Sequence, residues 1–127
     1  MFRKFIVVGA VAAASVLATG AQAHPKMLSA SPAANATVQH IKSIEIRFSE
    51  KLVSQFSGVE LAMTDMPGMK MNTPMKMAGI KTMVAPDGKT LMVMLTKPLP
   101  TGTYKLAYHV VSADTHRIDG GYMFKVK

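Results

Sequence analysis

Residues 43–49 read Ser-Ile-Glu-Ile-Arg-Phe-Ser, and this short segment indicates how the whole chain folds. Apolar side chains at Ile44, Ile46 and Phe48 alternate with charged ones at Glu45 and Arg47. Successive side chains of a β-strand point to opposite faces, so a period of two is typical of a half-buried strand. The segment therefore predicts a strand with one face in a hydrophobic core and the other in water.

Similar segments lie on both sides of it along the chain, separated by turn residues such as Pro86-Asp87-Gly88. The predicted strands are residues 26–30, 43–49, 58–63, 80–85, 90–96, 103–112 and 121–126. Residues 51–56 read as an irregular link with room for one helical turn, and Met92 and Met94 are expected to be packing residues. Seven short strands without a convincing helix predict an all-β fold, a β-sandwich or small barrel in one domain.

The first 23 residues differ in composition from the rest. Arg3 and Lys4 precede an apolar run that reaches Gly20, and Ala21-Gln22-Ala23 follows it. A basic start, an apolar centre and an A-x-A end are the three parts of a secretory signal peptide. We therefore expect residues 1–23 to be cleaved and residues 24–127 to form the mature domain. An uncleaved N-terminal anchor is the alternative, although the run is short for a membrane span of roughly 20 apolar residues.

Charge and cysteine content exclude some classes of function. The chain has 15 Lys and Arg against 7 Asp and Glu, and two of the basic residues lie in residues 1–23. The 13 basic and 7 acidic residues that remain give a formal charge of +6, dispersed singly along the chain. Nucleic-acid binding is not supported, because no basic run with interleaved aromatic residues is present. There are no cysteines, so the domain must be held together by core packing rather than by disulfides.

Methionine is concentrated in residues 63–77, which read MTDMPGMKMNTPMKM. Half of the chain's 12 methionines lie in this run: Met63, Met66, Met69, Met71, Met75 and Met77. Pro67, Gly68 and Pro74 interrupt the run, so a loop is predicted rather than a regular strand or helix. Thioether sulfur is soft and prefers soft metals such as Cu(I), which makes this run a candidate Cu(I) site. The alternative is that these methionines fill irregular gaps in the core.

A second group of candidate ligands involves the new N-terminus. Cleavage after Ala23 would leave His24 with a free α-amine, which can chelate one metal together with the imidazole Nδ1. Pro25 has no N–H, so its backbone nitrogen cannot become a further ligand. Asp114 and His116 are two residues apart, so in an extended segment their side chains would point the same way. Nitrogen and oxygen donors of this kind suit Cu(II), whereas a solvated surface loop is the alternative.

Four stretches of sequence together resemble the CopC family of periplasmic copper-binding proteins. In chain order they are residues 24–26 (HPK), residues 48–58 (FSEKLVSQFSG), residues 66–69 (MPGM) and residues 110–116 (VVSADTH). The resemblance spans residues 24–127 and implies a CopC-like copper-binding domain. The fold it implies is a seven-stranded Greek-key β-sandwich of the immunoglobulin-like or cupredoxin-like kind.

The resemblance also implies two copper sites at opposite ends of the sandwich. The Cu(II) site maps onto His24, Asp114 and His116. The Cu(I) site maps onto Met63, Met66, Met69 and Met75, with Met71 and Met77 as additional donors. Relatives often carry a histidine in this loop, where residues 69–72 here read Met-Lys-Met-Asn, so an all-thioether site is expected. The implied partners are copper ions and either an inner-membrane, CopD-like copper transporter or a periplasmic multicopper oxidase.

The function predicted from these features is that of a periplasmic protein which carries or sequesters copper in copper homeostasis and resistance. We expect no enzymatic activity, because no Ser-His-Asp or paired-carboxylate arrangement stands out. The alternative is a copper mono-oxygenase, since an N-terminal histidine chelate with a second histidine resembles a histidine brace. A purely structural β-sandwich is a third hypothesis, and it leaves the methionine run unexplained.

Overall fold

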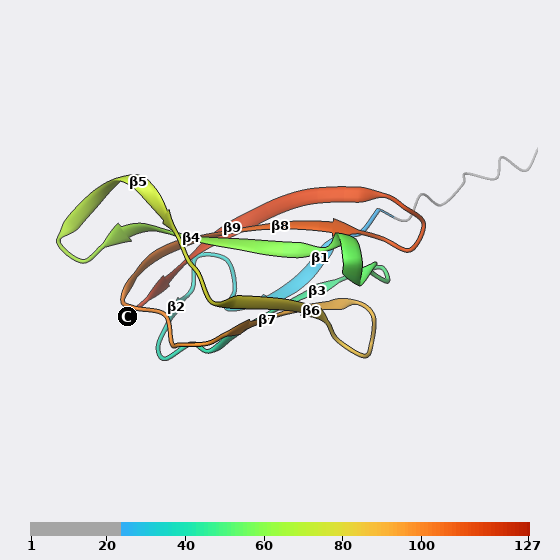
Figure 1. Cartoon of the computed structure of the whole chain (residues 1–127), viewed down its shortest axis with the longest axis horizontal. Helices are drawn as coiled ribbons and strands as arrows, with labels where there is room; N and C mark the ends of the chain where they lie inside the picture. Colours follow the sequence, from blue (N-terminus) through green and yellow to red (C-terminus); the bar gives the residue numbers. More distant parts are fainter. Residues whose placement is uncertain (1–23) are drawn as a thin grey trace, which may run out of the picture.

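The computed structural model describes residues 24–127, so the predicted signal peptide lies outside the described residues. Residues 24–127 form two β-sheets packed face to face, with strands running along the length of the molecule (Figure 1). The four-stranded sheet has the order β1-β3-β7-β6, and the five-stranded sheet has the order β2-β9-β8-β4-β5. The chain crosses repeatedly between the two layers, as it does in Greek-key sandwiches. The predicted all-β sandwich is confirmed.

The described residues contain nine strands and one short helical turn. The strands are β1 Met27–Ser31, β2 Thr37–Val38, β3 Ser43–Phe48, β4 Gly58–Met66, β5 Met69–Lys76, β6 Ile80–Val84, β7 Thr90–Leu95, β8 Gly102–Val111 and β9 Arg117–Val126. The turn η1, Ser54–Phe56, lies in the predicted irregular link. All seven predicted strands are present, although β4 runs three residues further than predicted and β9 begins four residues earlier.

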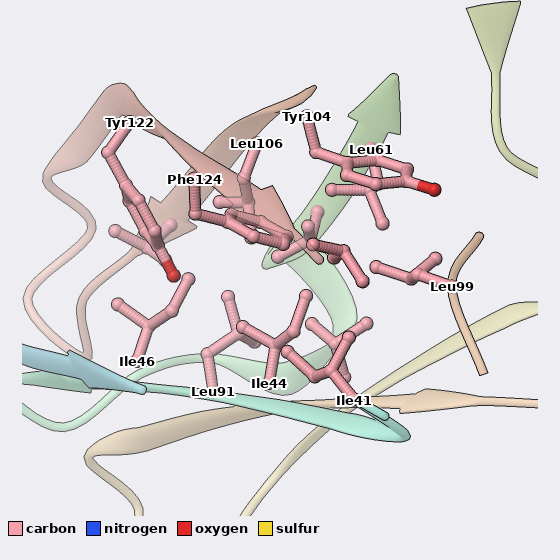
Figure 2. Packing of buried hydrophobic residues seen from close by; sticks show 14 of the residues in the cluster. Ile41, Ile44, Ile46, Leu61, Leu91, Leu99, Tyr104, Leu106, Tyr122 and Phe124 are labelled. Carbon is pink, nitrogen blue, oxygen red and sulfur yellow. The ribbon is translucent and has the colours of Figure 1, made fainter. Parts of the chain in front are cut away.

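The alternating segment behaves as its sequence predicts. In β3 the side chains of Ile44, Ile46 and Phe48 are fully buried, whereas those of Glu45 and Arg47 are exposed. Figure 2 shows Ile44, Ile46 and Leu91 rising from one sheet to meet residues such as Phe124 of the other. Burial of a large aliphatic side chain contributes about 1.5–3 kcal/mol relative to leaving it exposed. One continuous core between the sheets therefore holds this cysteine-free domain together.

The prediction that residues 63–77 form a loop is wrong, because β4 and β5 form a β-hairpin there. Met66 and Met69 pair directly across Pro67 and Gly68, and Gly68 has φ of 73°. Proline at the second position and a left-handed glycine at the third suit a type II turn. Pro74 is tolerated because β5 is the edge strand of its sheet, where a missing N–H breaks no ladder. Turn residues thus mark the hairpin's tip rather than a loop.

A matched pair of tyrosines tests the energetics of the core. The hydroxyl of Tyr104 donates to the carbonyl of Pro100 at 2.6 Å. The hydroxyl of Tyr122 is buried without a hydrogen-bond partner among the described residues, and Figure 2 shows it pointing toward Ile46. Burial raises the pKa of Tyr122 to about 12.

We expect Tyr104→Phe to lower the free energy of unfolding by about 1 kcal/mol, because it removes a satisfied hydrogen bond. Tyr122→Phe should leave the free energy of unfolding unchanged or raise it. The Tyr122 hydroxyl loses its hydration on burial and gains no hydrogen bond in return, so removing it should not destabilise the fold. Urea unfolding of both variants checks this contrast. A larger loss for Tyr122→Phe than for Tyr104→Phe would contradict it.

Candidate metal centres

The two predicted groups of ligands lie at opposite ends of the sandwich. The β4–β5 hairpin, labelled at β5, projects at one end, and the connection between β8 and β9 lies at the other (Figure 1). Residue 24 also lies at that second end, because the ring of His24 contacts that of His116 in this connection.

The β8–β9 connection is a tight turn closed by the backbone. The N–H of Ser112 donates to the carbonyl of His116 at 2.9 Å, and the N–H of Thr115 donates to the carbonyl of Ser112 at 2.9 Å. Thr115 adopts φ of 73°, a left-handed conformation that costs energy for a β-branched residue. The N–H of Ala113 also donates a hydrogen bond to the carbonyl of Lys51 at 2.9 Å. The turn therefore presents Asp114 and His116 from a constrained backbone.

Within this turn, Asp114 accepts hydrogen bonds on both carboxylate oxygens. The Ser112 hydroxyl donates to Oδ1, and Oδ2 lies 2.8 Å from Nδ1 of His116. The hydrogen bonds from Ser112 and His116 lower the pKa of Asp114 from 3.8 to about 2. Sequence reasoning missed Ser112, whose only signal was its place two residues before an expected ligand. It is a buried polar residue, 1% exposed, whose hydroxyl orients the carboxylate.

The structure brings His24 to His116. Their ring centroids lie 4.6 Å apart with an interplanar angle of 65°. The segment after His24 is fixed because Pro25 is buried, and the N–H of Lys26 donates to the Ser49 hydroxyl at 2.9 Å. Since Nδ1 of His116 is engaged by Asp114, Nε2 is the ring nitrogen that remains for a metal.

The three predicted Cu(II) residues are neighbours, but their side chains do not form a ready-made cage. Among residues 24–127, no group of three or more His, Cys, Asp or Glu side chains is arranged to hold a metal ion. Asp114 contacts His116, and His116 contacts His24. A carboxylate bound to the second nitrogen of a metal-binding histidine fixes the tautomer and orientation of the ring. The arrangement therefore suits Asp114 as the residue that orients His116, as well as a candidate ligand.

The lowered pKa of Asp114 predicts a pH-dependent contribution to stability. A carboxyl with a lower pKa in the folded chain than in the unfolded chain stabilises the fold above about pH 4, and this contribution is lost toward pH 2. Metal-free Asp114→Asn should therefore melt below the unsubstituted protein at pH 6, and the gap should close as pH falls from about 4 to 2. Thermal unfolding followed by circular dichroism measures this gap.

Asp119→Asn is the control, because Asp119 pairs with Arg117 in an exposed contact of 3.4 Å between Oδ1 and Nε. Exposed pairs contribute little, so its melting point should stay close to that of the unsubstituted protein throughout. A gap for Asp114→Asn that persists unchanged at pH 2 would contradict the assigned role of the carboxylate.

At the other end, the hairpin places its methionines in cross-strand pairs. Met66 lies directly opposite Met69, and Met63 lies directly opposite Met75. Side chains directly opposite in an antiparallel pair have Cβ atoms about 4.5–5.5 Å apart. Between the pairs the register shifts, because Asp65 pairs with Lys70 and residues 71–74 bulge from the strand. Two pairs of thioethers thus lie along one hairpin.

Exposure divides the five predicted Cu(I) residues into two kinds. Met66, Met69 and Met75 are 43%, 63% and 46% exposed, which no core-filling role explains. Met63 is only 1% exposed and belongs to the core, and Met71 is half-buried against it. The expectation that Met63 is displayed on a loop is wrong, because its side chain faces the core in step with Leu61 and Val59. The core-filling alternative therefore holds for Met63 and fails for the three exposed methionines.

A cysteine-free β-sandwich with imidazoles at one end and exposed thioethers at the other is the arrangement expected of a small copper-binding protein. The chain belongs to the CopC family, because the family model described as the CopC domain matches residues 27–127. The resemblance seen in the sequence is confirmed, and with it the assignment to copper binding in copper resistance.

Individual relatives agree with this assignment. The chain is 48% identical to Copper resistance protein C of Xanthomonas campestris pv. juglandis over 126 residues, covering 99% of this chain and 98% of that protein. It is 45% identical to Copper resistance protein C of Pseudomonas syringae pv. tomato, covering 91% and 90%. The crystal structure of PcoC, a methionine-rich copper resistance protein from Escherichia coli, matches with a TM-score of 0.74 and 40% identity, covering 83% of this chain and 100% of that one. The part of the chain that the structure describes contains no membrane-spanning helix.

Proposed function

We propose that this protein carries or sequesters copper in the periplasm, with Cu(II) at the end formed by residue 24 and the β8–β9 turn, and Cu(I) at the methionine hairpin. The observation that carries the proposal is the 4.6 Å approach of the His24 and His116 rings, with Asp114 bound to the second of them. Copper is the cargo in this proposal rather than a cofactor for a reaction.

At the Cu(II) end, His24 supplies its α-amine and its imidazole once residues 1–23 are removed. His116 supplies Nε2, because Nδ1 faces Asp114 at 2.8 Å. Asp114 either orients His116 or completes the set as a ligand, and its low pKa keeps it ionised in both roles. Three nitrogens and a carboxylate are the donors that Cu(II) prefers in tetragonal geometry.

At the Cu(I) end, Met66, Met69 and Met75 offer exposed neutral sulfur donors. Met71 lies on the same strand as Met69 and Met75 and packs against the core. Met63 lies opposite Met75 and can join them only if the hairpin's base opens toward the core. Cu(I) gains from thioethers and Cu(II) gains little, so the two ends differ in the oxidation state that they bind. Thioethers also need no deprotonation, so Cu(I) binding should persist at acidic pH.

Residues 1–23 support export, and the family resemblance suggests the partners. The A-x-A end of residues 1–23 supports cleavage and export, and a chain without cysteines loses no ligands to disulfides in an oxidising compartment. A CopD-like transporter in the inner membrane and a periplasmic multicopper oxidase are the partners we propose for copper transfer. One carrier could exchange copper with both partners if one end of the sandwich prefers Cu(II) and the other prefers Cu(I).

Carriage rather than catalysis is favoured by the carboxylate beside the two imidazoles. An oxygen-activating copper site needs an open coordination position, which Asp114 would close if its carboxylate left Nδ1 of His116 and bound the metal. With ascorbate, the copper-loaded protein should therefore produce no more hydrogen peroxide than copper chelated by a His-Pro peptide does. Sustained peroxide production would favour a mono-oxygenase instead.

The decisive test is titration of the chain beginning at His24 with Cu(II), and separately with Cu(I) under reducing conditions. His116→Ala should weaken Cu(II) binding more than Asp114→Ala does, because imidazole is the stronger donor for this ion, and both should spare Cu(I). His40→Asn is the matched control, since His40 is exposed with φ of 49°, a conformation that asparagine also adopts. Equal Cu(II) affinity in His116→Ala and His40→Asn would overturn the proposed site.

A further inference from the structure

Three methionines lie outside the hairpin, on the solvent face of the other sheet. Met83 in β6 and Met94 in β7 are 38% and 41% exposed, and Met92 in β7 is half-buried. The expectation that Met92 and Met94 are packing residues does not hold for the core, because neither belongs to the core cluster or to the side chains packed against it. The proposed copper sites involve none of these three residues.

The strand register gathers these three side chains into one patch. Met83 lies directly opposite Met92 across the β6–β7 pair. Met94 follows Met92 by two residues on the same strand and so shares its face, diagonally across from Met83. Opposite Cβ atoms are about 4.5–5.5 Å apart and diagonal ones about 7–8 Å, within reach of long, flexible side chains. Three sulfurs can therefore converge above the sheet without any change in the backbone.

The composition of β6 and β7 separates thioethers from the core. The inward faces of these strands carry Ile80, Val84, Leu91, Val93 and Leu95, and no methionine. A sheet face turned to water usually carries polar side chains, as β3 does with Ser43, Glu45 and Arg47. Methionine used as a filler would lie on the other face. Its position here exposes sulfur to solvent instead.

We propose that Met83, Met92 and Met94 form an additional soft-metal site for a monovalent ion such as Cu(I) or Ag(I). The donors are neutral and need no deprotonation, so the site selects soft ions over Cu(II) or Zn²⁺. Glu45 of β3 lies directly opposite Met92, and Lys81 of β6 lies directly opposite Met94. The carboxylate of Glu45 partly offsets the repulsion between Lys81 and a bound cation. The patch is separate from the hairpin, because β4 and β5 belong to the five-stranded sheet. It is also separate from His24, which contacts His116 in the β8–β9 turn and leads into β1, with β3 between β1 and β7.

The test uses Ag(I), which is redox-stable, with the chain beginning at His24 and methyl-¹³C-labelled methionine. Met66→Leu, Met69→Leu and Met75→Leu together first remove the exposed hairpin donors. Met63, Met71 and Met77, which are buried or packed against the core, then give the only methionine methyl signals left in residues 63–77. We expect the ε-methyl resonances of Met83, Met92 and Met94 to shift together and to reach their end point near one equivalent of Ag(I). Adding Met83→Leu should reduce the shifts of Met92 and Met94 by at least about half, because their shared ion loses a donor.

Met123→Leu is the matched control. Met123 is 40% exposed on the outer face of the five-stranded sheet, opposite Lys105 rather than another methionine. This substitution should leave the three shifts unchanged, and leucine preserves apolar volume in both variants, which thermal unfolding verifies. Absence of shifts at Met83, Met92 and Met94, shifts that need a large excess of Ag(I), or shifts of Met92 and Met94 that survive Met83→Leu would each overturn the proposal. The hairpin-intact protein, titrated in parallel, reports on the hairpin site separately.

Discussion

An added residue or an acetyl group ahead of His24 should weaken Cu(II) binding by more than about 100-fold and leave Cu(I) binding unchanged. The α-amine is an amide nitrogen in the uncleaved chain, and an amide followed by Pro25 cannot replace it through the next backbone nitrogen. Loss of a direct ligand should cost more than the about 10–100-fold that removal of an outer-shell partner costs. Competition titration of the blocked and free forms against a chelator measures the change.

The same experiment separates chelation by residue 24 from binding by the β8–β9 turn alone. A blocked protein still has the His24 and His116 imidazoles, whose rings lie 4.6 Å apart, and the Asp114 carboxylate. Those groups without the amine would give a weaker site with fewer nitrogens. The fold should be unaffected, because Pro25 remains buried and the Lys26–Ser49 hydrogen bond is remote from the added group. Equal Cu(II) affinity in the blocked and free forms would exclude the amine as a ligand.

The sandwich itself could be predicted from the sequence because burial on one face leaves a local pattern. In β3 every second residue is apolar and buried, and in β7 the buried Leu91 and Val93 alternate with methionines that are not buried. Such alternation depends only on the strand's own sequence and on which face meets the core. The two-residue strand β2 leaves no such pattern, since it pairs in parallel with β9 through Thr37 and Val38 alone.

The hairpin was not predictable in the same way, because tertiary position overrides local turn signals there. Pro74 reads as a strand breaker, yet it lies on an edge strand where proline is tolerated. The insertion of residues 71–74 as a bulge also hides the alternation that would have indicated β5. Which methionines face the core depends on that register, and register cannot be read from the spacing of methionines.

The sequence indicated which residues belong to the candidate sites, but it did not indicate how those residues contact one another. The spacing of Asp114 and His116 suggested two side chains that point at one metal, whereas the structure makes them partners of each other at 2.8 Å. That contact depends on the left-handed conformation of Thr115 and on the buried hydroxyl of Ser112. Neither feature has a reliable signature in a sequence of this composition. The approach of His24 to His116 depends on the fold of the whole domain.

Replacing Met66, Met69 and Met75 together with leucine should lower the Cu(I) affinity of the hairpin site by several orders of magnitude and spare Cu(II). These three side chains are the exposed thioethers of the hairpin, and leucine keeps their volume without their sulfur. Because they contribute little to the core, the free energy of unfolding should change by less than about 0.5 kcal/mol. Separate titrations with Cu(I) and Cu(II), alongside urea unfolding, measure these effects.

Met63→Ala is the contrasting variant, since Met63 is 1% exposed and lies opposite Met75 on the same hairpin. Truncation of a buried methionine to alanine costs about 2–5 kcal/mol, so this variant should be strongly destabilised. Met63→Leu should fold well because the volume is kept, and its Cu(I) affinity then shows whether a buried sulfur takes part. A triple variant that loses stability while it keeps Cu(I) would mean that the exposed methionines support the fold. A Met63→Leu variant that loses Cu(I) would mean that the hairpin opens to bring its buried sulfur to the metal.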